Sequence, residues 1–258
     1  MNEHLLSSIK SHVLYLTINR PVDRNALNRE LVLQLTTAFN QAASNSAVRA
    51  ILLSGAGTDA FCAGADLREL ADLRTGEERG VFFRAIADLI LAMSRCPKPI
   101  VTKVHGYALA GGCGLVAASD IAIASEEAIF GLPEIKIGIA PLMIIAPLSR
   151  TLSRKTLADL VLTGDTFTAQ RAFDAGLISR LVAKNDLDTE AESLVTRVAK
   201  GAPRALAAAK EALWSAPDQD YANSLFALAD KVGLLAISDD ALEGVTAFTE
   251  KRRPTWKE

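Results

Sequence analysis

Short apolar runs that alternate with helical patterns constrain the fold of this chain most. Four runs rich in apolar and β-branched residues are predicted as strands: 13–18, 50–54, 99–105 and 121–124. The run 50–54 holds no charged residue, which is typical of a strand buried on both faces of a sheet. Helices are predicted after the N-cap residue Asn28 and at 81–95 and 111–118. Strands that alternate with helices favour a parallel sheet, so we expect an α/β fold.

The second half of the chain is almost entirely helical in pattern. Helices are predicted at 151–162, 169–175 (capped by Thr168), 187–200, 204–214 and 221–251, with one last strand at 181–182. Residues 201–203 and 216–217, which contain prolines, separate three of these helices. We therefore divide the chain into an α/β core, residues 1–195, and a C-terminal helical region, residues 196–258.

Composition excludes several classes of protein. The 258 residues are 50% hydrophobic and 22% charged with a net charge of −2, which indicates a globular chain without a surface for nucleic acid or an anionic membrane. The three cysteines, Cys62, Cys96 and Cys113, form no C-x-x-C motif, so no disulfide framework and no metal site is expected. The sequence shows no targeting segment and no run of eighteen apolar residues, so we expect a cytoplasmic protein.

Two stretches of small residues, 61–66 and 110–114, each lead into a predicted helix. The first N–H groups of a helix lack internal partners, and small side chains let a ligand approach them closely. Two such N–H groups aimed at one point form an oxyanion hole, although either stretch alone is equally typical of a tight packing turn. Residues 55–60 match the dinucleotide pattern G-x-G-x-x-A, but no helix opens there, which disfavours nucleotide binding.

Glu134 is the candidate acid or base. It follows Pro133, and apolar residues surround it in the sequence. Taken alone, it is typical of a surface loop; in an apolar cleft, desolvation would raise its pKa into the range of a general base. His105 and Asp120 lie near the glycine-rich stretch and are interpreted as structural residues, as is Cys113.

Together these stretches resemble the crotonase (enoyl-CoA hydratase/isomerase) family. The motifs are Ile-Asn-Arg-Pro at 18–21, Asn-Ala-Leu at 25–27, Phe-Cys-Ala-Gly-Ala-Asp-Leu at 61–67, Gly-Tyr-Ala at 106–108, Ala-Gly-Gly-Cys at 110–113, Ser-Asp at 119–120, Phe-Gly-Leu-Pro-Glu at 130–134 and Gly-Val-Thr-Ala-Phe-Thr-Glu-Lys-Arg at 244–252. They span essentially the whole chain in the family's order. The resemblance implies a spiral of ββα units followed by a C-terminal helical trimerisation region.

The resemblance also implies a function and a site. Family members bind acyl-CoA thioesters and hold the thioester oxygen with two backbone N–H groups, which fall at Ala65 and Gly111, while Glu134 serves as acid and base. Further residues would contact the CoA moiety: Arg24, Ala26, Ala63, Asp66, Leu67 and Arg68, with Phe248 and Lys251 contributed by a neighbouring subunit. A homotrimer or hexamer is expected. Coenzyme A is part of the substrate, so no separate cofactor and no metal is expected.

The sequence departs from the family pattern in two places. Family hydratases carry a second glutamate three residues after the oxyanion glycine, where this chain has Gly114. Hydration needs one group to place water and one to supply a proton, whereas moving a double bond needs a single base. The sequence therefore favours isomerisation, with a catalytically weak acyl-CoA-binding protein as the alternative. Residues 141–145 also differ from the family's usual Pro-Gly-x-Gly-Gly. This change alters the wall near the acyl group, so the sequence does not predict which acyl chain the protein binds.

Overall fold

Two sheets form the centre of the molecule in the computed structural model, which describes residues 3–256. The larger sheet has the order β1 (Leu5–Lys10), β2 (Val13–Ile18), β3 (Ala50–Gly55), β5 (Ile100–Val104), β7 (Ile121–Ser125) and β10 (Arg180–Val182). The smaller has the order β4 (Ala60–Cys62), β6 (Tyr107–Leu109), β8 (Ile129–Gly131) and β9 (Thr166–Thr168). Only β1 and β9 run antiparallel to their neighbours among these strands, so the predicted α/β class is confirmed.

The chain repeats a strand–strand–helix unit. A long strand in the large sheet is followed by a short strand in the small sheet and then by helical structure: β3, β4 and α2 (Leu67–Asp72); β5, β6 and α4 (Gly111–Ala118); β7, β8 and the 3-10 turn Pro133–Ile137. Because β4, β6 and β8 are parallel neighbours, their carboxyl ends lie along one edge of the small sheet. This edge carries all three stretches that the sequence singled out.

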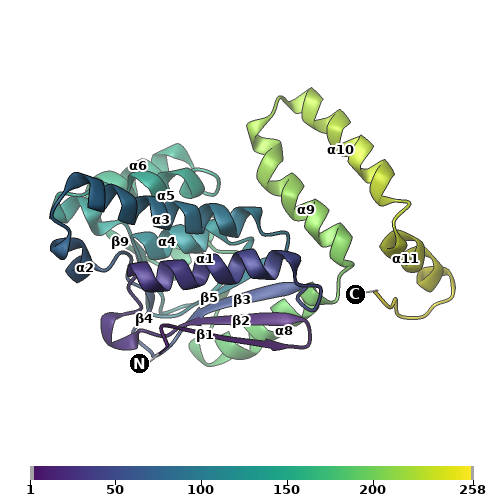
Figure 1. The fold of residues 1–258 in the computed structure, drawn as a ribbon, viewed down its shortest axis with the longest axis horizontal. Helices are drawn as coiled ribbons and strands as arrows, with labels where there is room; N and C mark the ends of the chain where they lie inside the picture. Colours follow the sequence, from purple (N-terminus) through teal and green to yellow (C-terminus); the bar gives the residue numbers. More distant parts are fainter. Residues whose placement is uncertain (1–2, 257–258) are drawn as a thin grey trace.

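Helices cover both faces of the large sheet, as the apolar run at 50–54 indicates. In Figure 1, α1 (Arg29–Ser44) and α3 (Gly76–Arg95) lie on one side of the strands, and α8 (Leu187–Ala199) lies on the other. Leu52 and Val101 of the sheet pack against Leu194 and Val195 of α8. Asn28 caps α1 by accepting a hydrogen bond from the N–H of Leu31, as expected from the sequence.

The remaining helices differ in places from the predicted ranges. They are α5 (Leu142–Leu148), α6 (Arg154–Thr163), α7 (Ala169–Asp174), α9 (Pro203–Ser215), α10 (Tyr221–Leu235) and α11 (Asp239–Thr249). Helix α6 begins later than predicted because Ser153 is its N-cap, and the predicted 221–251 helix breaks where Ser238 caps α11. Helix α5 was not predicted. Among residues 3–256, no helix has the length and apolar character that crossing a bilayer requires.

The C-terminal helices extend away from the two sheets (Figure 1). Lys210 of α9 is almost fully buried; its Nζ lies 2.8 Å from Asp120 Oδ2 and also donates to the carbonyls of Met93 and Lys98. Asp120 further accepts hydrogen bonds from the N–H of Ile100 and from Trp214 Nε1, which agrees with its interpretation as a structural residue. The boundary at 195/196 stays a prediction and falls inside α8; residues 1–2 and 257–258 of the predicted domains lie outside the described residues.

Candidate functional site

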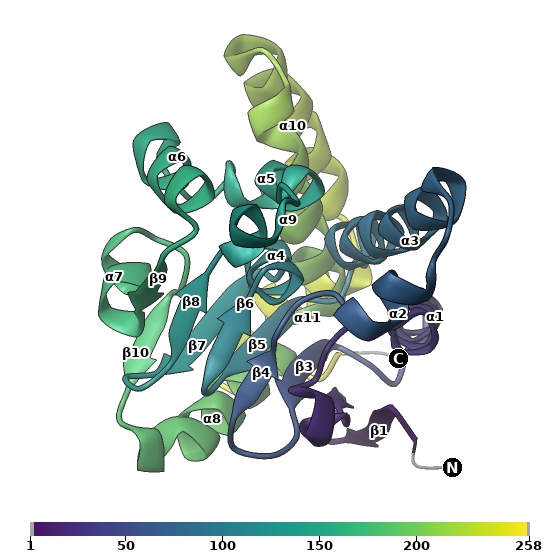
Figure 2. The ribbon, with the colours of Figure 1, turned by 90° about the vertical axis from the view of Figure 1, so that its left-hand side faces the viewer.

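Two turns from different repeats touch at the edge of the small sheet. The turn after β4 contains Gly64, with φ +93°, and a Cβ added there would lie 2.5 Å from the Cβ of Ala110 and 3.2 Å from the nitrogen of Gly111. A Cβ on Gly111 would in turn lie 3.9 Å from the nitrogen of Ala65. Figure 2 shows β4 and β6, whose ends carry the two turns, side by side. The absence of side chains therefore lets the two backbones meet.

The N–H groups of Ala65 and Gly111 are available to a ligand. Within residues 3–256, neither donates a hydrogen bond, although their neighbours do: Asp66 N donates to the carbonyl of Leu27 at 2.9 Å, and Gly114 N donates to the carbonyl of Ala110 at 3.2 Å. Gly111 is the first residue of α4, where the helix dipole adds partial positive charge. Two unpaired N–H groups aimed at one point would form a donor site for a negatively charged oxygen.

Both residues line an apolar cavity of about 500 Å³, and so does Glu134. The structure thus brings together the three residues predicted as catalytic. The other lining residues are Ala63, Leu67, Leu70, Phe83, Ile86, Ala110, Pro133, Lys136, Ile137, Ile139, Ala140, Pro141, Leu142, Met143 and Ile144. Within the described residues of this lining, Glu134 is the only carboxylic acid.

Glu134 lies in the 3-10 turn that follows β8. Its carbonyl accepts hydrogen bonds from the N–H groups of Gly138 and Ile139, which fix the turn. Its Oε2 is buried and has no hydrogen-bond partner among the described residues. Desolvation by burial raises the pKa of Glu134, and a hydrogen bond with its own backbone opposes the shift only in part. A carboxylate in this setting is a stronger base than one in water.

Helix α5 packs against Gly114, the position at which family hydratases are expected to carry a second glutamate. A Cβ added to Gly114 would lie 2.6 Å from Cγ2 of Ile144 and 3.2 Å from its Cβ, with Ile90 Cδ1 at 3.6 Å. Ile144 is buried and lines the cavity. An apolar side chain therefore occupies the space that a side chain at 114 would need.

The residues predicted to contact CoA on the body of the molecule also come together. The N–H of Ala63 donates a hydrogen bond to the carbonyl of Arg24 at 3.0 Å, and the N–H of Leu27 donates to the carbonyl of Gly64 at 2.7 Å. Arg68 Nη1 lies 3.2 Å from Asp23 Oδ1. The predicted set on this side, Arg24, Ala26, Ala63, Asp66, Leu67 and Arg68, thus lies on two hydrogen-bonded segments beside the cavity.

Asp66 is nearly buried and caps α2 by accepting hydrogen bonds from the N–H groups of Arg68 and Glu69. Its carboxylate is also 2.9 Å from Arg20 Nη2. Burial would raise the pKa of Asp66, but the hydrogen bonds from Arg20 and from the backbone outweigh it, so the pKa is lowered. Arg20 was not among the predicted site residues. The motif that contains it was recognised, but its partner lies 46 residues further along the chain.

Phe248 and Lys251 do not join this cluster within one chain. Phe248 is 84% exposed near the end of α11, Lys251 follows that helix, and neither lines the cavity. Their contribution from a neighbouring subunit stays a prediction.

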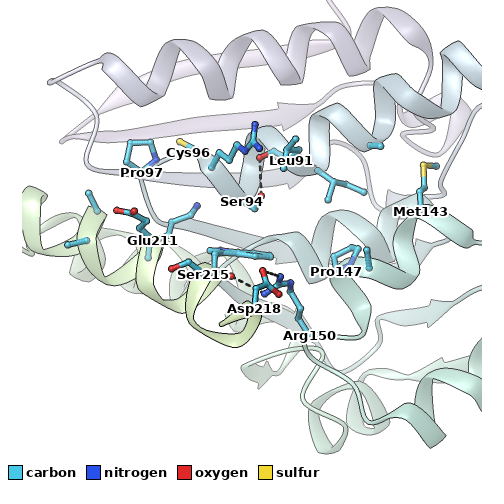
Figure 3. Close-up of a pocket in the computed structure, with 18 residues that line it drawn as sticks. Leu91, Ser94, Cys96, Pro97, Met143, Pro147, Arg150, Glu211, Ser215 and Asp218 are labelled. Atoms are coloured by element: carbon cyan, nitrogen blue, oxygen red, sulfur yellow. Dashed lines mark hydrogen bonds and ion pairs between the residues drawn. The ribbon is translucent and has the colours of Figure 1, made fainter. Parts of the chain in front are cut away.

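A second cavity of about 980 Å³ lies between α3, α5 and α9 (Figure 3). Figure 3 shows the ion pair between Arg150 and Asp218 at its wall. The guanidinium carbon of Arg150 also lies 5.7 Å from the centre of the Trp214 ring. None of the predicted site residues lines it, although Met143 borders both cavities. The site therefore belongs to the smaller cavity.

Two other residues near the turns, Cys113 and His105, do not line the cavity. Cys113 is buried, its Sγ donates to the carbonyl of Ala108 at 2.9 Å, and burial raises its pKa to about 12, which disfavours a reactive thiolate. Burial lowers the pKa of His105, and this residue does not line the cavity.

Comparison with known proteins identifies the family of this chain. The family model described as enoyl-CoA hydratase/isomerase matches residues 8–258. A 2,3-dehydroadipyl-CoA hydratase of Escherichia coli K12 is 36% identical over 255 residues, which cover 98% of both chains. A mevalonyl-coenzyme A hydratase of Aspergillus fumigatus is 35% identical over 260 residues, covering 98% of this chain and 94% of the relative.

Solved structures give the same result for the fold. An enoyl-CoA hydratase of Mycobacterium smegmatis has a TM-score of 0.95 at 35% identity, with 99% of each chain covered. One from Bacillus anthracis has a TM-score of 0.94 at 30% identity, again covering 99% of each chain. The fold is thus the crotonase fold, an α/β core with two mixed sheets and C-terminal helices, and it defines a class of enzymes acting on acyl-CoA. The chain belongs to the enoyl-CoA hydratase/isomerase family.

Proposed function

We propose that this enzyme moves the double bond of a 3-enoyl-CoA to C2–C3, with Glu134 as its single acid and base. The observation that carries the proposal is that Glu134 is the one carboxylic acid among the described residues of the cavity wall. In addition, Ile144 occupies the space that a side chain at position 114 would need. Moving a double bond requires one proton to leave and one to return, and a single carboxylate can do both.

In the proposed mechanism, the thioester oxygen accepts hydrogen bonds from the N–H groups of Ala65 and Gly111. Glu134 takes the proton from C2, and the negative charge spreads over the oxygen, C2 and C4. The protonated Glu134 then returns the proton to C4, which leaves the double bond between C2 and C3. The two N–H groups stabilise the charge that develops on the oxygen, an effect worth about 10²–10³ in rate for each donor.

We further propose that Arg24, Ala26, Ala63, Asp66, Leu67 and Arg68 contact the CoA moiety, and that the chain forms a homotrimer or hexamer through its C-terminal helices. Large exposed apolar side chains on α10 and α11 support this assembly: Leu225, Phe226, Val232, Leu234, Leu242, Val245 and Phe248. Phe248 and Lys251 then complete the CoA site of a neighbouring subunit. The cytoplasmic location and the absence of nucleic-acid and membrane partners stay predictions.

Hydration is the competing reaction, because the similar proteins named above are hydratases. The test incubates the purified enzyme with a 3-enoyl-CoA and with crotonyl-CoA and separates the products by chromatography. We expect 2-enoyl-CoA from the first substrate and little 3-hydroxyacyl-CoA from the second. Faster hydration than isomerisation would overturn the proposed reaction. Tight binding without turnover of either substrate would support the alternative, an acyl-CoA-binding protein.

Glu134→Gln is the matched variant for this test. We expect it to lower isomerase activity by about 10³-fold, because the base is lost, and to leave binding of a saturated acyl-CoA unchanged in calorimetry. In the wild type, activity requires the ionised carboxylate, so it should rise with pH through an apparent pKa above about 4.3, the ordinary value for glutamate. Unchanged activity in the variant would show that another base operates.

A further inference from the structure

Arg20 lies beside the candidate site without lining its cavity, and its guanidinium has three partners in two separate parts of the chain. Nη1 donates to the carbonyl of Ala26, and Nη2 lies 2.9 Å from both Asp23 Oδ2 and Asp66 Oδ2. The side chain is only 10% exposed. The first two partners lie in the turn that follows β2, and Asp66 is the residue next to Ala65.

From this guanidinium, a chain of two peptide groups leads to the N–H of Ala65. The carbonyl that Arg20 binds belongs to the same peptide group as the N–H of Leu27, and this N–H donates to the carbonyl of Gly64 at 2.7 Å. The Gly64 carbonyl belongs to the same peptide group as the N–H of Ala65. Because these peptide groups are planar and trans, each carbonyl points opposite to its N–H. The bond from Leu27 to Gly64 therefore directs the N–H of Ala65 away from residue 27.

The turn that holds Arg20 is itself fixed. Asn25 is fully buried, its Oδ1 accepts a hydrogen bond from Arg20 N at 2.9 Å, and its Nδ2 donates to the carbonyls of Ala56 and Ala60. The N–H of Asn25 donates to the carbonyl of Arg20 at 2.8 Å. A guanidinium held in this way keeps a constant orientation toward the peptide groups that follow.

We propose that Arg20 is a positioning residue for the oxyanion hole: it orients and polarises the N–H of Ala65 through the Ala26–Leu27 and Gly64–Ala65 peptide groups. A cation at one end of a hydrogen-bonded chain strengthens each donor along it. The guanidinium already faces the carboxylates of Asp23 and Asp66, so it is not a free cation for a CoA phosphate. The inference rests on the proposed function, because the N–H of Ala65 acts there on a thioester oxygen.

The test compares Arg20→Met and Arg20→Lys with the wild type. We expect Arg20→Met to lower kcat by about 10- to 100-fold with little change in KM, because the donor is weakened where charge develops. Arg20→Lys keeps the charge but loses the planar fork that reaches Ala26 and Asp66 together, so its loss should be smaller. It also keeps the test usable if Arg20→Met does not fold.

The second readout needs no turnover. The infrared stretching frequency of the carbonyl is recorded for bound butyryl-CoA labelled with ¹³C at the thioester carbon. Two N–H donors lower this frequency relative to free butyryl-CoA, and we expect Arg20→Met to move it back toward the free value. Unchanged frequency and kcat in a folded variant, or a raised KM with unchanged kcat, would overturn the proposal.

Arg29→Met is the control. Arg29, the first residue of α1, pairs with Glu69 of α2 at 3.3 Å, so it also links another part of the chain to this helix. Among the described residues, it makes no hydrogen bond to the peptide groups that lead to Ala65. It should leave both kcat and the carbonyl frequency unchanged. If the wild type turns over no enoyl-CoA, the proposed function fails, whereas the infrared comparison still tests the role of Arg20.

Discussion

The two turns that present N–H groups to the cavity are built by different means. The turn at 63–66 is held by side-chain and backbone hydrogen bonds, with Asp66 and Arg20 at its centre. The turn at 110–114 has no side-chain cap; Ala110 adopts φ 51° and ψ −122°, and every residue of α4 is buried. The first is positioned by charge and the second by close packing. The two should therefore respond differently to substitution and to pH.

The largest effect is expected where packing is tightest. A Cβ on Gly112 would lie 2.1 Å from the carbonyl oxygen of Cys62, which is backbone and cannot move aside cheaply. We expect Gly112→Ala to lower the free energy of unfolding by about 3 kcal/mol in urea denaturation and to remove activity. Gly80→Ala is the control, since its Cβ would meet only the flexible Arg84 side chain at 3.4 Å. It should stabilise α3 by roughly 0.5–1 kcal/mol. Unchanged stability and activity in Gly112→Ala would show that the backbone of the second turn can shift to accommodate the added Cβ.

The local patterns in the sequence predicted the elements whose signals are local. The caps at Asn28 and Thr168 and the uncharged run at 50–54 correspond to observed features. The strands β4, β6 and β8 have three residues each and are stabilised by pairing with one another, so no local pattern marks them. Helix α5 carries Pro147 inside it, which hides a helical pattern.

Only those residues of the candidate site that belong to sequence motifs could be predicted. Ala65, Gly111 and Glu134 came from motif positions, and the structure places all three on one cavity. The contact of Ile144 with Gly114 could not be predicted, because it depends on how α5 packs on α4. Arg20 was missed for a similar reason: its hydrogen bond to Ala26 reaches a backbone carbonyl, and a sequence pattern gives no sign of such a bond.

The next largest effect is expected for Gly114→Glu, in the turn at 110–114, which should change both stability and the reaction catalysed. Gly114→Glu puts a carboxylate against Ile144, so we expect a loss of about 2 kcal/mol in stability. Combining it with Ile144→Gly removes the side chain that blocks position 114. The double variant should recover part of that stability and hydrate crotonyl-CoA faster than the wild type in a spectrophotometric assay. If Gly114→Glu alone gains hydratase activity, the wall formed by α5 is not what excludes a second acid.

The smallest effect belongs to the charged turn, and its pH dependence separates the two turns. Asp66→Asn keeps an N-cap residue but removes the charge that faces Arg20, so we expect a loss of about 1 kcal/mol at pH 7. The pKa of Asp66 is lowered by folding, so its contribution is present above the unfolded value of about 3.9 and is lost as pH falls through the folded pKa.

Urea denaturation of the wild type and Asp66→Asn should therefore show a stability difference that shrinks to nothing in acid. The penalty of Gly112→Ala comes from overlap of uncharged atoms and should keep its size over the same range. A constant difference for Asp66→Asn would mean that the first turn, like the second, is held by shape rather than by charge.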